Sequence, residues 1–210
     1  MPATSPFQDH TQRYDRWFDK YHRAYEAELK AVRSFLPQGG RGLEVGVGTS
    51  RFAAPLGVSF GVEPIFQMAR MAQSRKTRVT GGVAEQLPFR SSLFDFLLMV
   101  TTVCFIDNLE KAFSEADRVL IPSGCLIVAF VDKESSLGQL YEKNKDDSVF
   151  YKDATFYSVP ELVEIMTKSG FRDFRFKQTL FHELSEITAT EPVKNGHGEG
   201  AFVVISSTKH

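Results

Sequence analysis

The stretch at residues 43–50, Leu-Glu-Val-Gly-Val-Gly-Thr-Ser, constrains the fold of this chain more than any other. Its alternating apolar residues predict a short buried strand that runs directly into a glycine turn. Gly46 and Gly48 can adopt backbone angles that are closed to other residues, and a ligand can lie against their main chain. Thr49 and Ser50 are expected to cap a following helix, whose free N–H groups favour an anionic group. The segment therefore predicts a turn that binds a nucleotide-like ligand.

Two common nucleotide-binding turns are excluded by the residues that follow. A dinucleotide fingerprint, G-x-G-x-x-G, needs a glycine or alanine where this chain has Arg51. A phosphate-binding P-loop needs a Lys-Ser or Lys-Thr pair after its glycines, and this segment contains none. The identity of the ligand must therefore be sought in residues further along the chain.

Alternating strand and helix patterns predict a doubly wound α/β fold. The expected strands cover residues 43–47, 58–63, 78–83, 94–100, 125–131, 171–180 and 201–205. The expected helices cover residues 12–36, 51–54, 65–74, 107–120 and 158–169, the last beginning with a capping box at Ser158 and Glu161. The run at 94–100 is almost continuously apolar, which is typical of a strand covered on both faces.

No helical pattern separates the last two expected strands, so the last strand should be antiparallel to its neighbours. We therefore expect a Rossmann-like, seven-stranded, mostly parallel sheet with helices on both faces. The whole of residues 1–210 is expected to form one domain, with a flexible polar tail at residues 1–11.

The carboxyl ends of the parallel strands are the expected binding edge of such a sheet. Glu63 ends the second expected strand and lies 19 residues after Glu44. A carboxylate at this point can accept both ribose hydroxyls of an adenosine, and Pro64 offers a flat apolar surface to one adenine face. Alternatively, Glu63 complements the positive N-terminal end of the next helix.

From about residue 40 to residue 131 the chain resembles the class I S-adenosylmethionine (SAM)-dependent methyltransferases, of the small-molecule, type 11-like kind. The resemblance rests on acid-x-Gly-x-Gly at 44–48, G-x-A-E-x-L-P-F at 82–89, and R-V-L-x-P-G-G at 118–124. The last two segments lie at the expected distances from the first. Ser50 and Ser123 stand where glycine is common in the family, and the sequence leaves open whether the Cβ atom of Ser50 crowds the methionine end of the cofactor.

The resemblance implies that SAM is the cofactor and S-adenosylhomocysteine (SAH) the product. In the family, the alanine backbone N–H and the following acid read the adenine edge, which assigns these roles to Ala84 and Glu85. Carbonyl groups near Thr101 would hold the methionine ammonium, whereas Asp107 is expected to cap the next helix. The expected cofactor-binding residues are Tyr14, Glu44, Gly46, Gly48, Glu63, Pro64, Ala84, Glu85 and Thr101.

Three segments are expected to lie over the same strand ends and to enclose an acceptor. They are an N-terminal helical lid at 12–36 and two substrate-side insertions at 132–157 and 181–200. Aromatic residues recur at helical spacing in the first segment, where some could cover the ligand and others could pack on the domain. The expected acceptor-binding residues are Trp17, Phe105, Tyr141, Tyr151 and His182.

Methyl transfer is an in-line displacement at a sulfonium, so the cofactor carries the difficult chemistry. The protein aligns the reactants, excludes water and, for an alcohol or amine, removes a proton. Candidate bases are His182, Glu183 and His197, although a lone loop histidine is usually only solvated. No Cys or His pair has the spacing of metal ligands, so no metal site is expected.

The composition is that of an ordinary globular protein, with 42% hydrophobic and 24% charged residues. A formal net charge of -1 gives no general attraction to nucleic acid, so a nucleic-acid partner is not expected. No apolar run approaches the roughly 18 residues that span a bilayer, and no secretory leader is recognised, so we expect no membrane partner. Cys104 and Cys125 lie in or beside apolar runs, which favours core thiols in a reducing compartment and a cytoplasmic location.

The sequence leaves three functions open. The first is a SAM-dependent methyltransferase with a small-molecule acceptor of unknown identity. The second is a catalytically silent SAM- or SAH-binding module that acts as a sensor or partner, which the missing obvious base keeps open. The third, aminopropyl transfer, is disfavoured because the fourth strand is followed by residues 101–104, Thr-Thr-Val-Cys, and not by paired aspartates.

Overall fold

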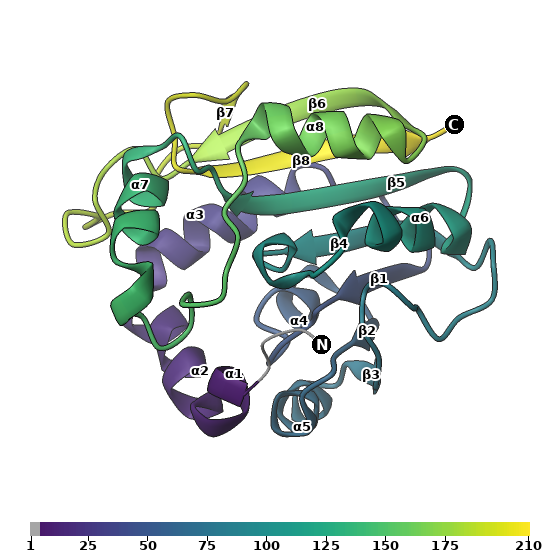
Figure 1. Ribbon diagram of the computed structural model, residues 1–210, viewed down its shortest axis with the longest axis horizontal. Coiled ribbons are helices and arrows are strands. Elements are labelled where there is room, and N and C mark those ends of the chain that lie inside the picture. The colour runs from purple at the N-terminus through teal and green to yellow at the C-terminus, as the bar shows by residue number, and fades with distance from the viewer. Residues whose placement is uncertain (1–4) are drawn as a thin grey trace.

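The computed structural model describes residues 5–210, which are built around one eight-stranded sheet (Figure 1). The strands lie in the order β3-β2-β1-β4-β5-β8-β6-β7, and β8 runs antiparallel to both of its neighbours, β5 and β6. Their bounds are β1 Gly42–Val45, β2 Phe60–Val62, β3 Arg78–Thr80, β4 Phe94–Val100, β5 Leu120–Val131, β6 Phe171–Thr179, β7 Lys194–Asn195 and β8 Phe202–Lys209. The predicted doubly wound, mostly parallel sheet with an antiparallel last strand is confirmed. The eighth strand, β7, is a two-residue addition within the insertion at 181–200.

Helices cover both faces of the sheet, as the two separate hydrophobic clusters show. One face is covered by α6 (Leu109–Val119) and α8 (Val159–Lys168), and the other by α3 (His22–Arg33) and α4 (Ala53–Leu56). Along β4, alternate residues enter the two clusters, so both faces of this strand are buried. This double burial explains why its sequence is almost continuously apolar.

The N-terminal segment is helical from Ser5 to Arg33, but it is divided into three helices. They are α1 (Ser5–Asp9), α2 (Thr11–Lys20) and α3, with the break between the last two at Tyr21. The prediction of one continuous helix at 12–36 was therefore wrong, because two helices, α2 and α3, cover this segment. The tail expected at 1–11 was wrong from Ser5 onward, because Phe7 is buried and its ring packs on Tyr14. Residues 1–4 of that tail lie outside the described part of the chain.

Several element boundaries differ from expectation because backbone caps fall elsewhere. The helix after the glycine turn, α4, begins only after Phe52, and neither Thr49 nor Ser50 caps it. Asn108, and not Asp107, caps α6 by accepting a hydrogen bond from the Lys111 backbone N–H. The capping box expected at the start of α8 is confirmed.

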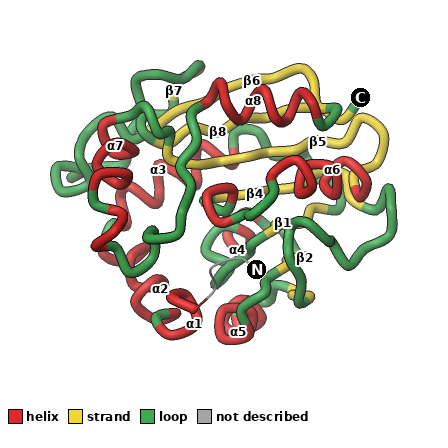
Figure 2. The backbone as a smooth tube through the Cα atoms, in the orientation of Figure 1, coloured by secondary structure: helices red, strands yellow, loops and turns green. Residues whose placement is uncertain are grey.

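The insertion at 132–157 forms an arm that contains α7 (Ser136–Lys143) and a short 3-10 helix, η2 (Lys145–Asp147). Figure 2 shows that the rest of this arm is loop, as is most of the chain between β6 and β8. The arrowheads of β4 and β6 point toward α7 in Figure 1. The arm and the helices α1 and α2 therefore lie at the carboxyl-end side of the parallel strands. Among the helices that the structure describes, none is long and apolar enough to cross a membrane.

Candidate functional site

A cavity of about 1520 Å³ opens at the carboxyl ends of the parallel strands. Its floor is the glycine turn after β1 and the ends of β2 and β4, and its walls come from α2, α3, α7 and the loop after β6. Ligand pockets for one small molecule usually measure ~300–1,000 Å³. This cavity is therefore large enough for a cofactor and a second small molecule together.

The glycine turn forms one end of this cavity. Gly46 has a φ of +70°, and a Cβ atom there would lie 2.4 Å from the Thr102 Cγ2 atom. Gly48 also has a positive φ, and its backbone N–H donates to the Glu63 Oε2 atom over 2.8 Å. Both glycines line the cavity, so the turn presents bare backbone to whatever binds there.

Glu63 lies directly beside that turn, as the sequence predicted. Its Oε1 atom accepts a hydrogen bond from the Ile65 backbone N–H over 3.0 Å, and its side chain is buried at the cavity wall. Burial raises the pKa of Glu63 to about 7, although its two backbone hydrogen bonds act in the opposite direction. Each carboxylate oxygen keeps accepting capacity beyond its one backbone donor, which fits a ribose with two neighbouring hydroxyls. Pro64 also lines the cavity.

Glu44 does not line the cavity, which corrects its expected role as a contact of the cofactor. Its side chain is buried beneath the turn, and its Oε2 atom has no hydrogen-bond partner within the described residues. Burial raises the pKa of Glu44 to about 8. Ser50 also points away from the cavity, because its hydroxyl pairs with that of Thr77 over 2.6 Å. The Cβ atom of Ser50 therefore does not crowd the binding surface.

The remaining residues expected to bind the cofactor all line the cavity: Tyr14, Ala84, Glu85 and Thr101. The Glu85 Oε1 atom accepts hydrogen bonds from the Asp107 and Asn108 backbone N–H groups over 3.1 and 3.3 Å. Glu85 therefore also holds the start of α6 in place. The Tyr14 hydroxyl lies over Gly48, and burial, followed by the charges of Glu44 and Glu63, raises the pKa of Tyr14.

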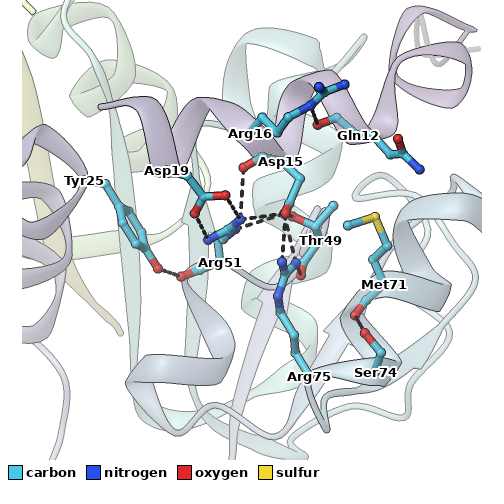
Figure 3. A network of polar contacts seen from close by, with 10 residues as sticks. All are labelled: Gln12, Asp15, Arg16, Asp19, Tyr25, Thr49, Arg51, Met71, Ser74 and Arg75. Atoms are coloured by element: carbon cyan, nitrogen blue, oxygen red, sulfur yellow. Dashed lines mark hydrogen bonds and ion pairs between the residues drawn. The ribbon is translucent and has the colours of Figure 1, made fainter. Parts of the chain in front are cut away.

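Helix α2 is fastened to the glycine turn by a network around Asp15, drawn in Figure 3. The Asp15 carboxylate accepts from Arg51 over 2.6 and 2.9 Å, from Arg75 over 2.8 and 2.9 Å, and from the Thr49 hydroxyl over 2.6 Å. Burial alone would raise the pKa of Asp15, but the two guanidinium groups hold it well below its usual range. Thr49 and Arg51 thus serve to anchor α2 and do not cap α4.

Aromatic rings form the other end of the cavity, as expected for an acceptor site. Trp17, Phe105, Tyr141 and Tyr151 all line it. The Tyr151 ring is stacked on the Tyr141 ring with centroids 5.0 Å apart, and it lies parallel to the Phe105 ring at 6.0 Å. Trp17 comes from α2 and Phe105 from the segment after β4, whereas Tyr141 and Tyr151 come from α7 and the loop that follows it.

The candidate bases are separated by the fold. His182 and Glu183 line the cavity, and His182 pairs through Nδ1 with the buried Glu191 carboxylate. His197 does not reach the cavity: it is exposed and packs against the Phe176 ring of β6. The structure therefore does not support the prediction that His197 acts as a base in this cavity. In the described residues, no three His, Cys, Asp or Glu side chains are grouped so that they could hold a metal ion.

Two cavity features were missed in the sequence. Glu28, on α3, is buried and lines the cavity, and Phe7, on α1, does the same. Glu28 follows Tyr21 by seven residues and Tyr25 by three, so it lies on the apolar face of its helix. An acidic residue on the apolar face of a helix was the feature of the sequence that could have indicated a buried functional group at Glu28. Phe7 gave none, because it stands alone among polar residues.

Comparisons with known proteins bear on the family of this chain. A family described as "Methyltransferase domain" (Methyltransf_11) matches residues 43–128. An uncharacterized protein of Methanocaldococcus jannaschii is 41% identical over 203 residues, which cover 97% of this chain and 98% of that protein. A crystal structure from Thermotoga maritima, described as a SAM-dependent methyltransferase and possible histamine N-methyltransferase, has a TM-score of 0.97 at 52% identity, covering 99% of this chain and 100% of that one. The malonyl-[acyl-carrier protein] O-methyltransferase of Geobacter sulfurreducens is 30% identical over 127 residues, which are 53% of this chain and 48% of that enzyme.

Proposed function

Because this chain belongs to the class I SAM-dependent methyltransferases, we propose that it transfers the methyl group of SAM to a small-molecule acceptor bound in the same cavity. The observation that carries the proposal is the shape of the site. One cavity reaches from the glycine turn and Glu63 to the aromatic wall at Tyr141 and Tyr151. A cofactor at the first end and an acceptor at the second would thus share one space.

At the cofactor end, the backbone of Gly46 and Gly48 would support the amino-acid portion of SAM. The Glu63 carboxylate would accept the ribose hydroxyls, and Pro64, Ala84 and Glu85 would surround the adenine. The donor and acceptor inventory fits the group: a buried carboxylate beside bare backbone, with apolar surface on either side. Tyr14, which the Asp15 network holds over the turn, would close the site from above.

The bound cofactor supplies an electrophilic methyl group, so the chain has to position the acceptor and exclude water. Phe105 lines the cavity parallel to Tyr151, and its ring would confine the acceptor beside the methyl group. His182 would accept a proton from an acceptor hydroxyl or amine, and its pairing through Nδ1 with Glu191 would orient the ring so that Nε2 is free to do so. This assignment requires the loop at 181–186 to turn His182 inward, since its side chain is 69% exposed.

The names of two relatives suggest which classes of acceptor to test first. The Thermotoga neighbour is described as a possible histamine N-methyltransferase, and the Geobacter relative is named as an O-methyltransferase of malonyl-[acyl-carrier protein]. A useful panel therefore contains amines (histamine, phenethylamine, tryptamine), the three alcohols in which a hydroxyl replaces the amino group, and short-chain carboxylates.

The test has a binding arm and a turnover arm. Calorimetry with SAM and SAH measures binding, and transfer of a labelled methyl group to the panel measures turnover. We expect Glu63→Ala to weaken SAM binding at least tenfold and to abolish transfer. The matched control Glu164→Ala truncates an exposed glutamate of α8 outside the cavity, and it should leave both unchanged. Absence of SAM binding to the wild-type protein would end the proposal. Binding without product for any acceptor would favour the silent-module alternative.

A further inference from the structure

Glu28 is a buried acid that no other group of the described chain neutralises. Its residue surface is 4% exposed, and it lines the cavity from α3. No hydrogen bond or ion pair joins its carboxyl group to any residue between 5 and 210. Burial alone raises the pKa of Glu28 to about 8. A carboxyl group in this position is costly to the fold, and it faces open space where a ligand can supply the missing partner.

The surroundings of Glu28 are aromatic. Burial, together with the nearby charge of Glu28, raises the pKa values of the hydroxyls of Tyr14, Tyr25, Tyr141 and Tyr151. None of these hydroxyls therefore ionises near neutral pH. The tyrosines come from α2, α3, α7 and the loop after α7, which together form the walls around the carboxyl group. Aromatic faces beside a carboxylate attract an organic cation by its charge and by the ring quadrupoles.

No basic side chain of the described residues pairs with the Glu28 carboxyl group. Arg51 and Arg75 hold Asp15, and the three basic residues that line the cavity (Arg13, Arg16 and Lys20) have exposed side chains and make no contact with Glu28. Acidic residues outnumber these three in the cavity lining, which also includes Asp19, Glu63, Glu85, Glu183, Glu186 and Glu199. The cavity therefore has a negative character that matches a positively charged ligand.

We propose that Glu28 binds a protonated amine of the acceptor, so that this methyltransferase acts on small amines with an apolar or aromatic body. The inference rests on the proposed function, since it names the acceptor class for the same cavity. The ammonium would donate to the Glu28 carboxylate while the carbon skeleton packs among Trp17, Tyr141 and Tyr151. The methylated atom is then a second nucleophilic atom of the acceptor, because a protonated nitrogen has no lone pair to attack the sulfonium.

Binding of a cation here has a consequence for protons. With its pKa raised to about 8, Glu28 carries a proton at pH 7 in the empty cavity. To pair with an ammonium it must release that proton. Amine binding should therefore release close to one proton per site at pH 7 and less at pH 9. Alcohols of the same shape should release none.

The experiment titrates SAH-saturated protein with the amine–alcohol pairs of the panel. We expect at least one amine to bind the wild type at least tenfold more tightly than its hydroxyl counterpart. Glu28→Gln, which keeps the shape and removes the charge, should weaken that amine at least tenfold and leave its alcohol and SAH within twofold. Glu164→Gln is the matched control, because the same chemical change there lies on an exposed helix face.

Three results would overturn the inference: amines and alcohols that bind alike, Glu28→Gln that binds amines as the wild type does, or Glu28→Gln that loses SAH. The last would assign Glu28 to the cofactor. If Glu28→Gln does not fold, proton release decides the matter on the wild type, measured by calorimetry in two buffers of different ionisation enthalpy. Failure of the proposed function is recognised separately, because the wild type would then bind no SAM or SAH at the start.

Discussion

Three buried carboxyl groups, those of Glu28, Glu44 and Glu63, lie in or beneath the cavity, and burial raises the pKa of each. In the unfolded chain these groups ionise near their ordinary value of 4.5. Between that pH and about 8 the folded protein therefore holds protons that the unfolded chain has released, so unfolding becomes easier as the pH rises. A chain that keeps three such groups gives up stability for a site that can hold polar and charged ligands.

Replacing Glu28 by glutamine should expose this effect. Below pH 4.5 both side chains are neutral in the folded and unfolded states, so the difference in the free energy of unfolding between the two proteins should be constant. As the pH rises through about 8, the wild type should lose about 4 to 5 kcal/mol relative to Glu28→Gln, and the difference should then level off. Urea unfolding at several pH values measures it. A difference that does not change with pH would show that Glu28 ionises in the folded protein as it does in water.

Gly46 and Ser50 make a matched pair in the same turn, since both have a positive φ, of 70° and 65°. Gly46→Ala would place a Cβ atom against Thr102 and add backbone strain, so we expect it to destabilise the protein by about 2 kcal/mol and to weaken SAM binding at least tenfold. Ser50→Gly relieves strain but loses the hydrogen bond to Thr77. These effects nearly offset each other, so stability should change by less than about 1 kcal/mol and SAM affinity by less than twofold. Thermal unfolding and calorimetry test both; equal effects of the two substitutions would contradict the role given to the turn.

At the scale of elements, the attachment of α2 depends on one carboxylate. Asp15 is held by two arginines from different parts of the chain, whereas Asp19, one turn further along, contacts only Arg51 and is 65% exposed in its side chain. Because both arginines are also partly buried, the pair at Asp15 is expected to matter more than the pair at the surface.

Asp15→Ala should lower the free energy of unfolding by about 2 to 3 kcal/mol, because Arg51 and Arg75 would be left without their buried partner. Asp19→Ala, the matched control, should cost less than about 1 kcal/mol. Since the pKa of Asp15 is lowered, its contribution is present above the ordinary value of 3.8 and is lost as the pH falls below it. The difference between wild type and Asp15→Ala should therefore shrink in acid. Similar losses for the two substitutions at pH 7 would contradict this account.

The sequence predicted the elements whose signals are local. The apolar run of β4, the capping box at Ser158 and the glycine turn at Gly46 each depend on a few adjacent residues, and each was found where expected. Elements that depend on distant partners were not predicted. The break between α2 and α3 at Tyr21 follows no proline or glycine, so no local signal marks it. Helix α1 is held in place by the Phe7 ring, which packs on Tyr14 nearby and on Phe105, more than 90 residues away.

The same limit applies to the site. The position of Glu63 was predicted from the end of its strand, since the carboxyl ends of the parallel strands lie at one edge of the sheet. The burial of Glu28 and the displacement of His197 to the Phe176 ring depend on how helices and loops pack, which no local pattern records. Glu44 belongs to the motif but lies beneath the turn, because strand alternation directs its side chain away from the cavity.

On the scale of the whole molecule, the cavity is closed by parts of the chain that have little structure of their own. Helix α1 has five residues, too few to be stable alone, and it is held by the packing of Phe7 on the rings of Tyr14, Phe105 and Phe150. These rings come from the N-terminal helices, the end of β4 and the arm after β5. The sheet, by contrast, is buried on both faces by the two hydrophobic clusters.

This difference predicts where a bound ligand changes the dynamics of the protein. We expect SAH to slow backbone amide exchange in α1, in α2 and in residues 144–151 by at least tenfold, because it would fill the space beneath their aromatic contacts. Amides of β4, β5 and β8 should change little, since the sheet already protects them. Hydrogen–deuterium exchange read by mass spectrometry resolves these segments, and Glu63→Ala at the same SAH concentration controls for binding. Protection spread evenly over the sheet and the N-terminal helices would mean that SAH stabilises the fold globally, and that α1 and α2 do not act as a lid.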